Sequence, residues 1–203
     1  MTGMTKAIDY FFTPPSPWTY LAGPRFKSLA QRNRLVINWK PFDLFAAFAL
    51  TGQKPVKKRP PQIQANRLTD LARWGSFLEM KINLEPKYFP ADPVLSSKMI
   101  IAALGTKADV TDLANAYMSA VWVEERDIAN PETVITIADE NGFDGKMLFQ
   151  SSGDKEIRQV LDRNTDEAIA RSVFGSPTWI YQEELFWGQD RLEFLTRAVE
   201  LTK

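Results

Sequence analysis

The stretch that decides the fold is "AIDYFFTPPSPWTYL", which runs from Ala7 to Leu21. Its first part, Ala7 to Phe12, is a short apolar and aromatic run that predicts a buried strand. Pro14-Pro15 follows, and a residue before proline avoids the α-helical region, so the chain leaves the strand in an extended form. Ser16 then has the side chain of a helix N-cap, and Pro17 suits the first helical position. The stretch therefore predicts a strand that leads directly into a helix.

The rest of the chain completes a β-α-β unit, a helical block and a β-β-α unit. Helical spacing of apolar residues continues to about Asn33, and Leu35 to Lys40 alternates like a second strand. Thr178 to Tyr181 and Leu185 to Trp187 predict a hairpin, and Asp190 to Leu201 predicts a final amphipathic helix. Between these units the patterns are helical, with no predicted strand.

This order predicts an α/β protein with a thioredoxin-like four-stranded sheet and an all-helical insertion. The expected domains are a thioredoxin-like domain from residues 1–43 and 174–203, and a helical insertion domain from residues 44–173.

Composition excludes several kinds of chemistry. The 203 residues include 25 Lys+Arg and 25 Asp+Glu, so no general charge excess favours nucleic acid or an anionic membrane. The chain has no cysteine and no histidine. It cannot use a thiol nucleophile, a Ser-His-Asp triad or thiolate and imidazole metal ligands, and we expect no metal. No segment has the roughly 20 apolar residues that cross a bilayer, and no leader pattern is visible. We therefore expect a cytoplasmic protein without a membrane partner.

The loop at Ser16 is similar in shape to the redox loop of thioredoxin-type proteins, with both sulfurs missing. Ser16 and Thr19 stand where the two cysteines would be. As a helix N-cap, Ser16 needs no further function, and a serine without a base is a poor nucleophile. Its hydroxyl can, however, donate a hydrogen bond at the positive end of a helix, where a thiolate brought by a ligand would be stabilised.

Two further segments could form a binding site with this loop. Gly175-Ser176-Pro177 precedes the third strand and is either an ordinary turn or a cis-proline segment that binds an extended peptide. We predict that the Ser176–Pro177 bond is cis and lies close to Ser16. Gly188-Gln189-Asp190 joins a strand to a helix, where Asp190 is either a simple N-cap or also a partner for a ligand's ammonium group.

The chain resembles the 2-hydroxychromene-2-carboxylate isomerases, which belong with the kappa-class glutathione transferases in the disulfide-oxidoreductase-A-like branch of the thioredoxin superfamily. The resemblance covers nearly the whole chain. Its most specific parts are "DYFFTPPSPWTYL" and "FGSPTWIYQEELFWGQDRL", supported by "LTDLARWG" and "AVWVEERDIANPE".

The resemblance implies a role for each matching residue. Ser16 matches the catalytic serine that holds the glutathione sulfur, and Ser176 the residue whose backbone pairs with the cysteinyl part. Ser176 departs from the usual valine or isoleucine, which a backbone role tolerates. The remaining glutathione-binding positions are Gln53, Pro177, Trp187, Gly188, Gln189 and Asp190, and those near the substrate are Lys54, Lys57, Lys58 and Tyr88. The alternative is that the three lysines belong to a solvated charged loop and do not bind the substrate.

The resemblance also implies an activity: glutathione-dependent interconversion of 2-hydroxychromene-2-carboxylate and trans-o-hydroxybenzylidenepyruvate, of the type found in aromatic catabolism. The expected partners are a small aromatic-derived carboxylate and a second copy of the chain in a homodimer. Two alternatives remain open: a kappa-type glutathione transferase or peroxidase, and a non-catalytic module that binds glutathione or a peptide.

Overall fold

The structure is a computed structural model that describes residues 6–202. Its centre is a four-stranded sheet in the order β2-β1-β3-β4, in which β1 is parallel to β2 and antiparallel to β3. The strands are β1 (Ala7–Phe12), β2 (Val36–Pro41), β3 (Thr178–Tyr181) and β4 (Glu184–Trp187). The predicted thioredoxin-like sheet is therefore confirmed, and within the described residues no strand interrupts the helical block.

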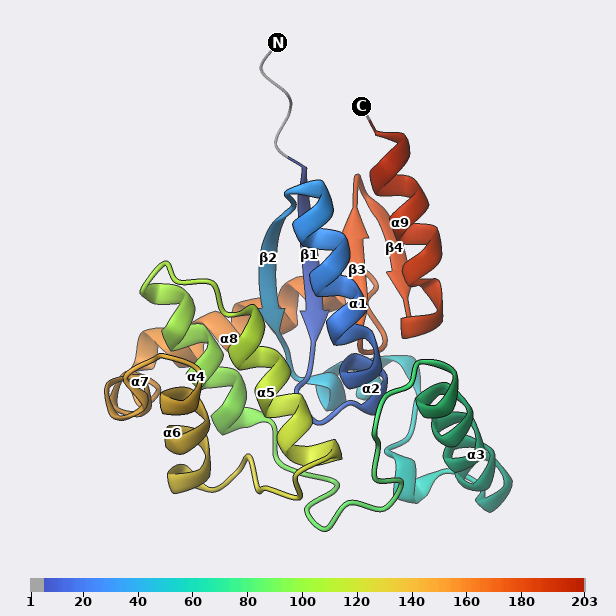
Figure 1. Cartoon of the computed structure of the whole chain (residues 1–203), viewed down its shortest axis with the longest axis horizontal. Helices are drawn as coiled ribbons and strands as arrows, with labels where there is room; N and C mark the ends of the chain where they lie inside the picture. Colours follow the sequence, from blue (N-terminus) through green and yellow to red (C-terminus); the bar gives the residue numbers. More distant parts are fainter. Residues whose placement is uncertain (1–5, 203) are drawn as a thin grey trace.

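The helices divide between the sheet and the insertion (Figure 1). They are α1 (Pro17–Asn33), α2 (Leu44–Thr51), α3 (Pro61–Phe77), α4 (Val94–Gly105), α5 (Thr111–Trp122), α6 (Pro131–Glu140), α7 (Gly145–Ser151), α8 (Lys155–Ala170) and α9 (Leu192–Leu201), with short 3₁₀ turns η1 (Val56–Lys58) and η2 (Gln189–Arg191).

Strand β1 is buried on both faces because helices cover each side of the sheet. Tyr10 and Phe12 pack with α1 and with helices of the insertion in one large core cluster. Phe11 points the other way, into a smaller cluster that includes Ala168 of α8. The larger cluster joins the sheet to the insertion, so the two domains that we propose, residues 1–43 with 174–203 and residues 44–173, share one core.

The predicted start of α1 is confirmed. Ser16 is the N-cap with an extended backbone, its side chain accepts a hydrogen bond from the Thr19 amide at 3.3 Å, and Pro17 is the first helical residue. A cap of this kind satisfies one of the amides that a helix leaves free at its start. The same local rule places Asp43 and Asn130 at the starts of α2 and α6, where each side chain accepts a backbone amide.

Two helices end earlier than their apolar patterns predict. The pattern of α3 continues to Lys81, but the helix ends at Phe77, because Glu79 has φ of 53° and the Met80 amide bonds back to the Gly75 carbonyl. Helix α8 ends in the same way at Ala170, because Ser172 has φ of 59° and the Val173 amide bonds back to the Ala168 carbonyl. Glycine is the residue that usually marks such a left-handed turn, and neither position has one, so the sequence gives no warning.

Helix α3 is attached to the rest of the molecule by little buried surface. Only Leu71 and Gly75 of its residues are buried. Figure 1 shows α3 to one side, beyond the ends of β1 and β2 and near the start of α1. The helix therefore borders the region next to Ser16 without being part of the main core.

In the described part of the chain, no helix is both long and apolar enough to cross a membrane.

Candidate active site

A cavity of about 590 Å³ opens at the start of α1. Its walls come from five segments, within residues 13–18, 44–59, 67–74, 89–93 and 175–191. The volume lies in the range of about 300–1,000 Å³ that small-molecule sites occupy. The cavity therefore gathers the Ser16 loop, the segment before β3 and the start of the last helix at one place, as the sequence predicts.

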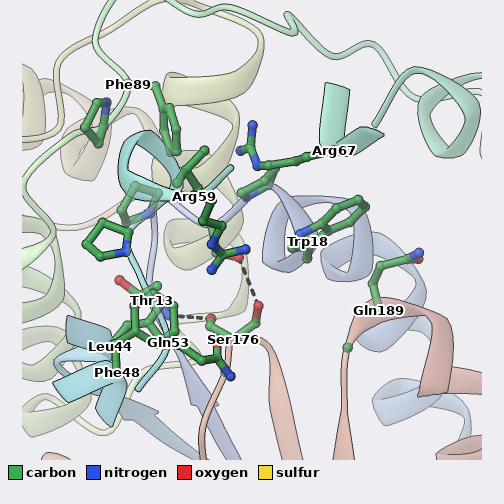
Figure 2. A pocket seen from close by; sticks show the side chains of 18 of the residues that line it. Thr13, Trp18, Leu44, Phe48, Gln53, Arg59, Arg67, Phe89, Ser176 and Gln189 are labelled. Carbon is green, nitrogen blue, oxygen red and sulfur yellow. Dashed lines mark hydrogen bonds between the residues drawn. The ribbon is translucent and has the colours of Figure 1, made fainter. Parts of the chain in front are cut away.

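Ser16 lies at the centre of this arrangement and is directly bonded to the segment before β3. Its hydroxyl donates to the Ser176 carbonyl at 3.1 Å while accepting the Thr19 amide. The side chain is buried, yet it lines the cavity. The predicted closeness of Ser16 and Ser176 is confirmed, and so is the predicted cis bond between Ser176 and Pro177. Figure 2 shows Ser176 next to Thr13 at the cavity wall, with a dashed line for the hydrogen bond that joins them.

The Ser176 hydroxyl has a structural role that sequence reasoning missed. It accepts the Thr13 amide at 2.9 Å and forms a hydrogen bond of 2.8 Å with the Thr19 hydroxyl. All three residues are buried. The side chain thus ties the segment before β3 to both sides of the Ser16 loop, a function that the valine or isoleucine usual at this position could not perform.

Trp187, Gly188, Gln189 and Asp190 line the same cavity as Ser16. The Gly188 amide donates to the Pro177 carbonyl at 2.9 Å, and Gly188 has φ of 97°, a conformation that favours glycine. A Cβ on Gly175 would clash with the Trp187 indole, so the lack of a side chain at Gly175 lets these two segments approach closely.

The prediction that Asp190 caps the last helix is wrong. The chain enters α9 through the 3₁₀ turn η2, which places Asp190 inside the turn and makes Arg191 the residue before the helix. The Asp190 carboxylate instead pairs with the Arg191 guanidinium at 2.7 Å. It remains at the cavity wall, where it is exposed.

Arg25 of α1 holds Gln189 of this segment in place, a contact that the sequence did not predict. Its guanidinium donates to the Gln189 carbonyl at 3.2 Å and to the Gln189 side-chain oxygen. Burial lowers the pKa of Arg25, while the charges of Glu193 and Asp190 act in the opposite direction. Because Gln189 is buried and Arg25 is 164 positions away in sequence, this contact depends on the folded chain and no local pattern announces it.

The predicted substrate-side residues divide into two groups. Lys57 and Lys58 line the cavity, whereas Lys54 and Tyr88 are not among its lining residues. Gln53, which was predicted on the glutathione side, also lines the cavity. The two lysines that line it are exposed to solvent.

Two arginines that sequence reasoning passed over, Arg59 and Arg67, also line the cavity. Figure 2 shows both side chains directed into the same space. Burial, and then the charge of Arg59, lower the pKa of the Arg67 guanidinium to about 10. Spacing could have identified Arg67, since it shares a helix face with Asp70 and Trp74, which also line the cavity.

No group of acidic side chains in residues 6–202 could hold a metal ion. The groups available at the cavity are hydroxyls, backbone carbonyls and amides, cationic side chains and the carboxylates of Asp70 and Asp190.

Fold and site together define a thioredoxin-type protein in which the usual sulfurs are replaced by hydroxyls. The family model described as the DSBA-like thioredoxin domain matches residues 7–200. The 2-hydroxychromene-2-carboxylate isomerase of Sphingobium xenophagum is 31% identical over 202 residues, which cover 95% of this chain and 97% of the relative. The enzyme of the same name from Pseudomonas putida is 29% identical over 195 residues, covering 95% and 93%. The chain belongs to the 2-hydroxychromene-2-carboxylate isomerase family, within the DsbA-like thioredoxin domains.

A solved structure and a more distant relative agree with this placement. The structure of a 2-hydroxychromene-2-carboxylate isomerase superposes with a TM-score of 0.77 at 27% identity, covering 96% of this chain and 94% of that one. Glutathione S-transferase kappa 1 of Caenorhabditis elegans is 22% identical over 208 residues, covering 95% and 90%. The family is enzymatic, and its kappa-type branch is the more distant one.

Proposed function

We propose that this protein is a glutathione-dependent isomerase that interconverts 2-hydroxychromene-2-carboxylate and trans-o-hydroxybenzylidenepyruvate. The observation that carries the proposal is the bond between the Ser16 hydroxyl and the Ser176 carbonyl at the wall of a cavity, in a chain whose relatives are named for this reaction. The use of glutathione is supported by the name of the more distant relative, glutathione S-transferase kappa 1.

The residues at the cavity wall fit a bound thiol peptide. Among the described residues, the Ser176 carbonyl accepts a hydrogen bond only from the Ser16 hydroxyl, a partner that can rotate away. The Thr13 hydroxyl is buried at the same wall without a hydrogen-bond partner among the described residues. When bound, glutathione would supply a thiolate that adds reversibly to a conjugated carbon, so that the double bond becomes a single bond that can rotate.

In this proposal Ser16 changes its hydrogen-bond partner when the site is filled. A peptide amide would take the Ser176 carbonyl, as in strand-wise peptide binding, and the Ser16 hydroxyl would be released to donate to a thiolate. Ser16 lies at the N-terminus of the 17-residue helix α1, whose dipole favours a negative charge there. Ser16 therefore holds the thiol in its ionised form and does not attack the substrate.

The wall of Trp187, Gly188, Gln189 and Asp190 would hold the γ-glutamyl end. Asp190 is the candidate for the ammonium group, and Gln53 and Pro177 complete the glutathione side. Lys57 and Lys58 would meet the substrate, while Lys54 and Tyr88, which lie outside the lining, stay predictions from the resemblance. A cytoplasmic location and a homodimer likewise stay predictions.

Arg25→Met is expected to weaken glutathione binding by about threefold to tenfold, because a typical hydrogen bond contributes about 0.5–1.5 kcal/mol. The variant removes the donor that holds the Gln189 carbonyl and side chain in place. Isothermal titration with glutathione measures the effect. Arg32→Met is the matched control, since Arg32 lies in the same helix, is exposed, and bonds only to Ser28 in the described residues. Equal affinities in both variants would show that Arg25 does not support this wall.

The activity itself is tested by following the absorbance of trans-o-hydroxybenzylidenepyruvate with and without glutathione. We expect turnover that needs glutathione. Conjugation of a panel of electrophiles, without isomerisation, would favour the kappa-type transferase. Calorimetric binding of glutathione with turnover at the background rate would favour the binding module.

A further inference from the structure

The substrate side of the cavity contains two guanidinium groups without a carboxylate partner. In the described part of the chain, no hydrogen bond or ion pair reaches Arg67, and its buried Nη2 has no acceptor. Arg59 uses only its Nε, which donates to the Lys54 carbonyl at 2.7 Å. The two groups are close enough for the charge of Arg59 to act on Arg67.

The one carboxylate near Arg67 on the same helix is already engaged. Asp70 accepts from Arg73 at 3.0 Å with one oxygen and from Asn66 at 2.9 Å with the other. A buried cationic donor without an acceptor costs free energy, so Arg67, with the Arg59 guanidinium at the same cavity wall, marks a place for an anion.

Aromatic rings hold the two guanidinium groups in position. The guanidinium carbon of Arg67 lies 5.1 Å from the centre of the Phe89 ring and 5.8 Å from that of Trp122. That of Arg59 lies 5.7 Å from the centre of the Phe48 ring. Contact with ring faces leaves the in-plane N–H groups free, which is the geometry that a carboxylate uses for paired hydrogen bonds.

We propose that Arg59 and Arg67 together hold the carboxylate of the aromatic substrate, with Arg67 as the main specificity-determining residue. This inference rests on the proposed function and names the residues of its substrate subsite. Both arginines are half-buried, whereas Lys57 and Lys58 are exposed, and a charge attracts an anion more strongly when less water surrounds it. Phe89 and Trp74 line the same cavity and can contact the flat ring of such a substrate.

The test uses trans-cinnamate and its uncharged amide, trans-cinnamamide, titrated calorimetrically into the full chain without glutathione. We expect the wild type to prefer the acid by about tenfold or more, as charge-assisted paired bonds allow. Arg67→Met and Arg59→Met should each reduce this preference, and the double variant should abolish it. Arg67→Lys keeps the charge but loses the planar fork, and should retain part of the preference.

Arg158→Met is the matched control, since Arg158 is an exposed arginine of α8 that pairs with Asp162 and lies outside the cavity lining. The Arg158→Met variant should prefer trans-cinnamate over trans-cinnamamide as strongly as the wild type does. Arg67→Met should melt no lower than the wild type, because methionine keeps the apolar stem and removes a partly buried charge. Equal wild-type binding of acid and amide, or a double variant that still prefers the acid, would overturn the proposal.

Glutathione also has carboxylates, which the two arginines could bind in place of the substrate carboxylate. A second titration, with glutathione, distinguishes these two ligands. The affinity for glutathione should change by less than about twofold in Arg67→Met, well below the loss of about tenfold expected for a charge-assisted contact. A tenfold loss of glutathione affinity would contradict the assignment to the substrate. If the wild type bound cinnamate through the arginines but produced no isomerisation, the proposed function would fail and the carboxylate site would stand.

Discussion

Ser16→Ala is expected to lower the isomerisation rate at neutral pH by about 10- to 100-fold, because a hydrogen bond to a charged group contributes about 1.5–3 kcal/mol. If that bond favours the thiolate over the thiol, its loss raises the pKa of the bound thiol by about one to two units, at about 1.36 kcal/mol per unit. Part of the activity should therefore return at higher pH, where glutathione ionises without help. The Ser16 hydroxyl is at the N-cap of α1 and already acts as a donor there, to the Ser176 carbonyl.

The measurement is a pH–rate profile of the variant and the wild type, with thiolate absorbance followed in parallel. Ser16 also caps α1, and losing a cap costs about 1 kcal/mol, so both proteins are assayed well below their melting temperatures. Ser28→Ala is the control, since Ser28 lies in the same helix and bonds to the exposed Arg32. An unshifted thiol pKa with full activity would remove Ser16 from the mechanism. A covalent adduct on Ser16 in mass spectrometry would make it the nucleophile instead.

Ser176→Ala is expected to lower the free energy of unfolding by about 1–3 kcal/mol, the cost of leaving a buried polar group without its partner. The Thr13 amide and the Thr19 hydroxyl both lose a bond of less than 3 Å in this variant. Ser176→Val should be no more stable than the alanine variant, because its extra volume supplies no acceptor.

Urea unfolding of the two variants checks this result. Ser28→Ala should remain within about 0.5 kcal/mol of the wild type, as surface substitutions usually do. A loss of less than about 0.5 kcal/mol in both Ser176 variants, the range of a surface change, would mean that the Ser176 hydroxyl does not hold the loop.

The sequence predicts what local rules control. Ser16 caps α1 as expected, and Asp43 and Asn130 cap α2 and α6 by the same rule, because each cap needs only its own side chain and the next few amides. The four strands follow from short apolar runs, and the order of elements leads to the correct sheet. Asp190 shows the limit of such rules, since a 3₁₀ turn moved it from the cap position into the turn itself.

The contacts that complete the site are long-range, and no single stretch reveals them. Arg25 meets Gln189 and Ser176 meets Thr13 only because the first helix and the last hairpin share one end of the sheet. The closeness of Ser16 and Ser176 was predicted from the likeness to a thioredoxin-type loop and a cis-proline segment rather than from spacing. Arg67 was passed over because an arginine in an amphipathic helix is usually solvated, and only the folded chain shows that its buried Nη2 has no acceptor within residues 6–202.

The weak attachment of α3 has a consequence for how such enzymes diversify. The residues proposed to hold the thiol lie against the sheet and its central core, where most changes would cost stability. The residues of α3 that we propose contact the substrate, Arg67 and Trp74, belong to a helix with only two buried residues. Most replacements in this helix would therefore disturb little packing. Natural variation can therefore change the substrate through α3 while the half that we propose activates the thiol is inherited intact.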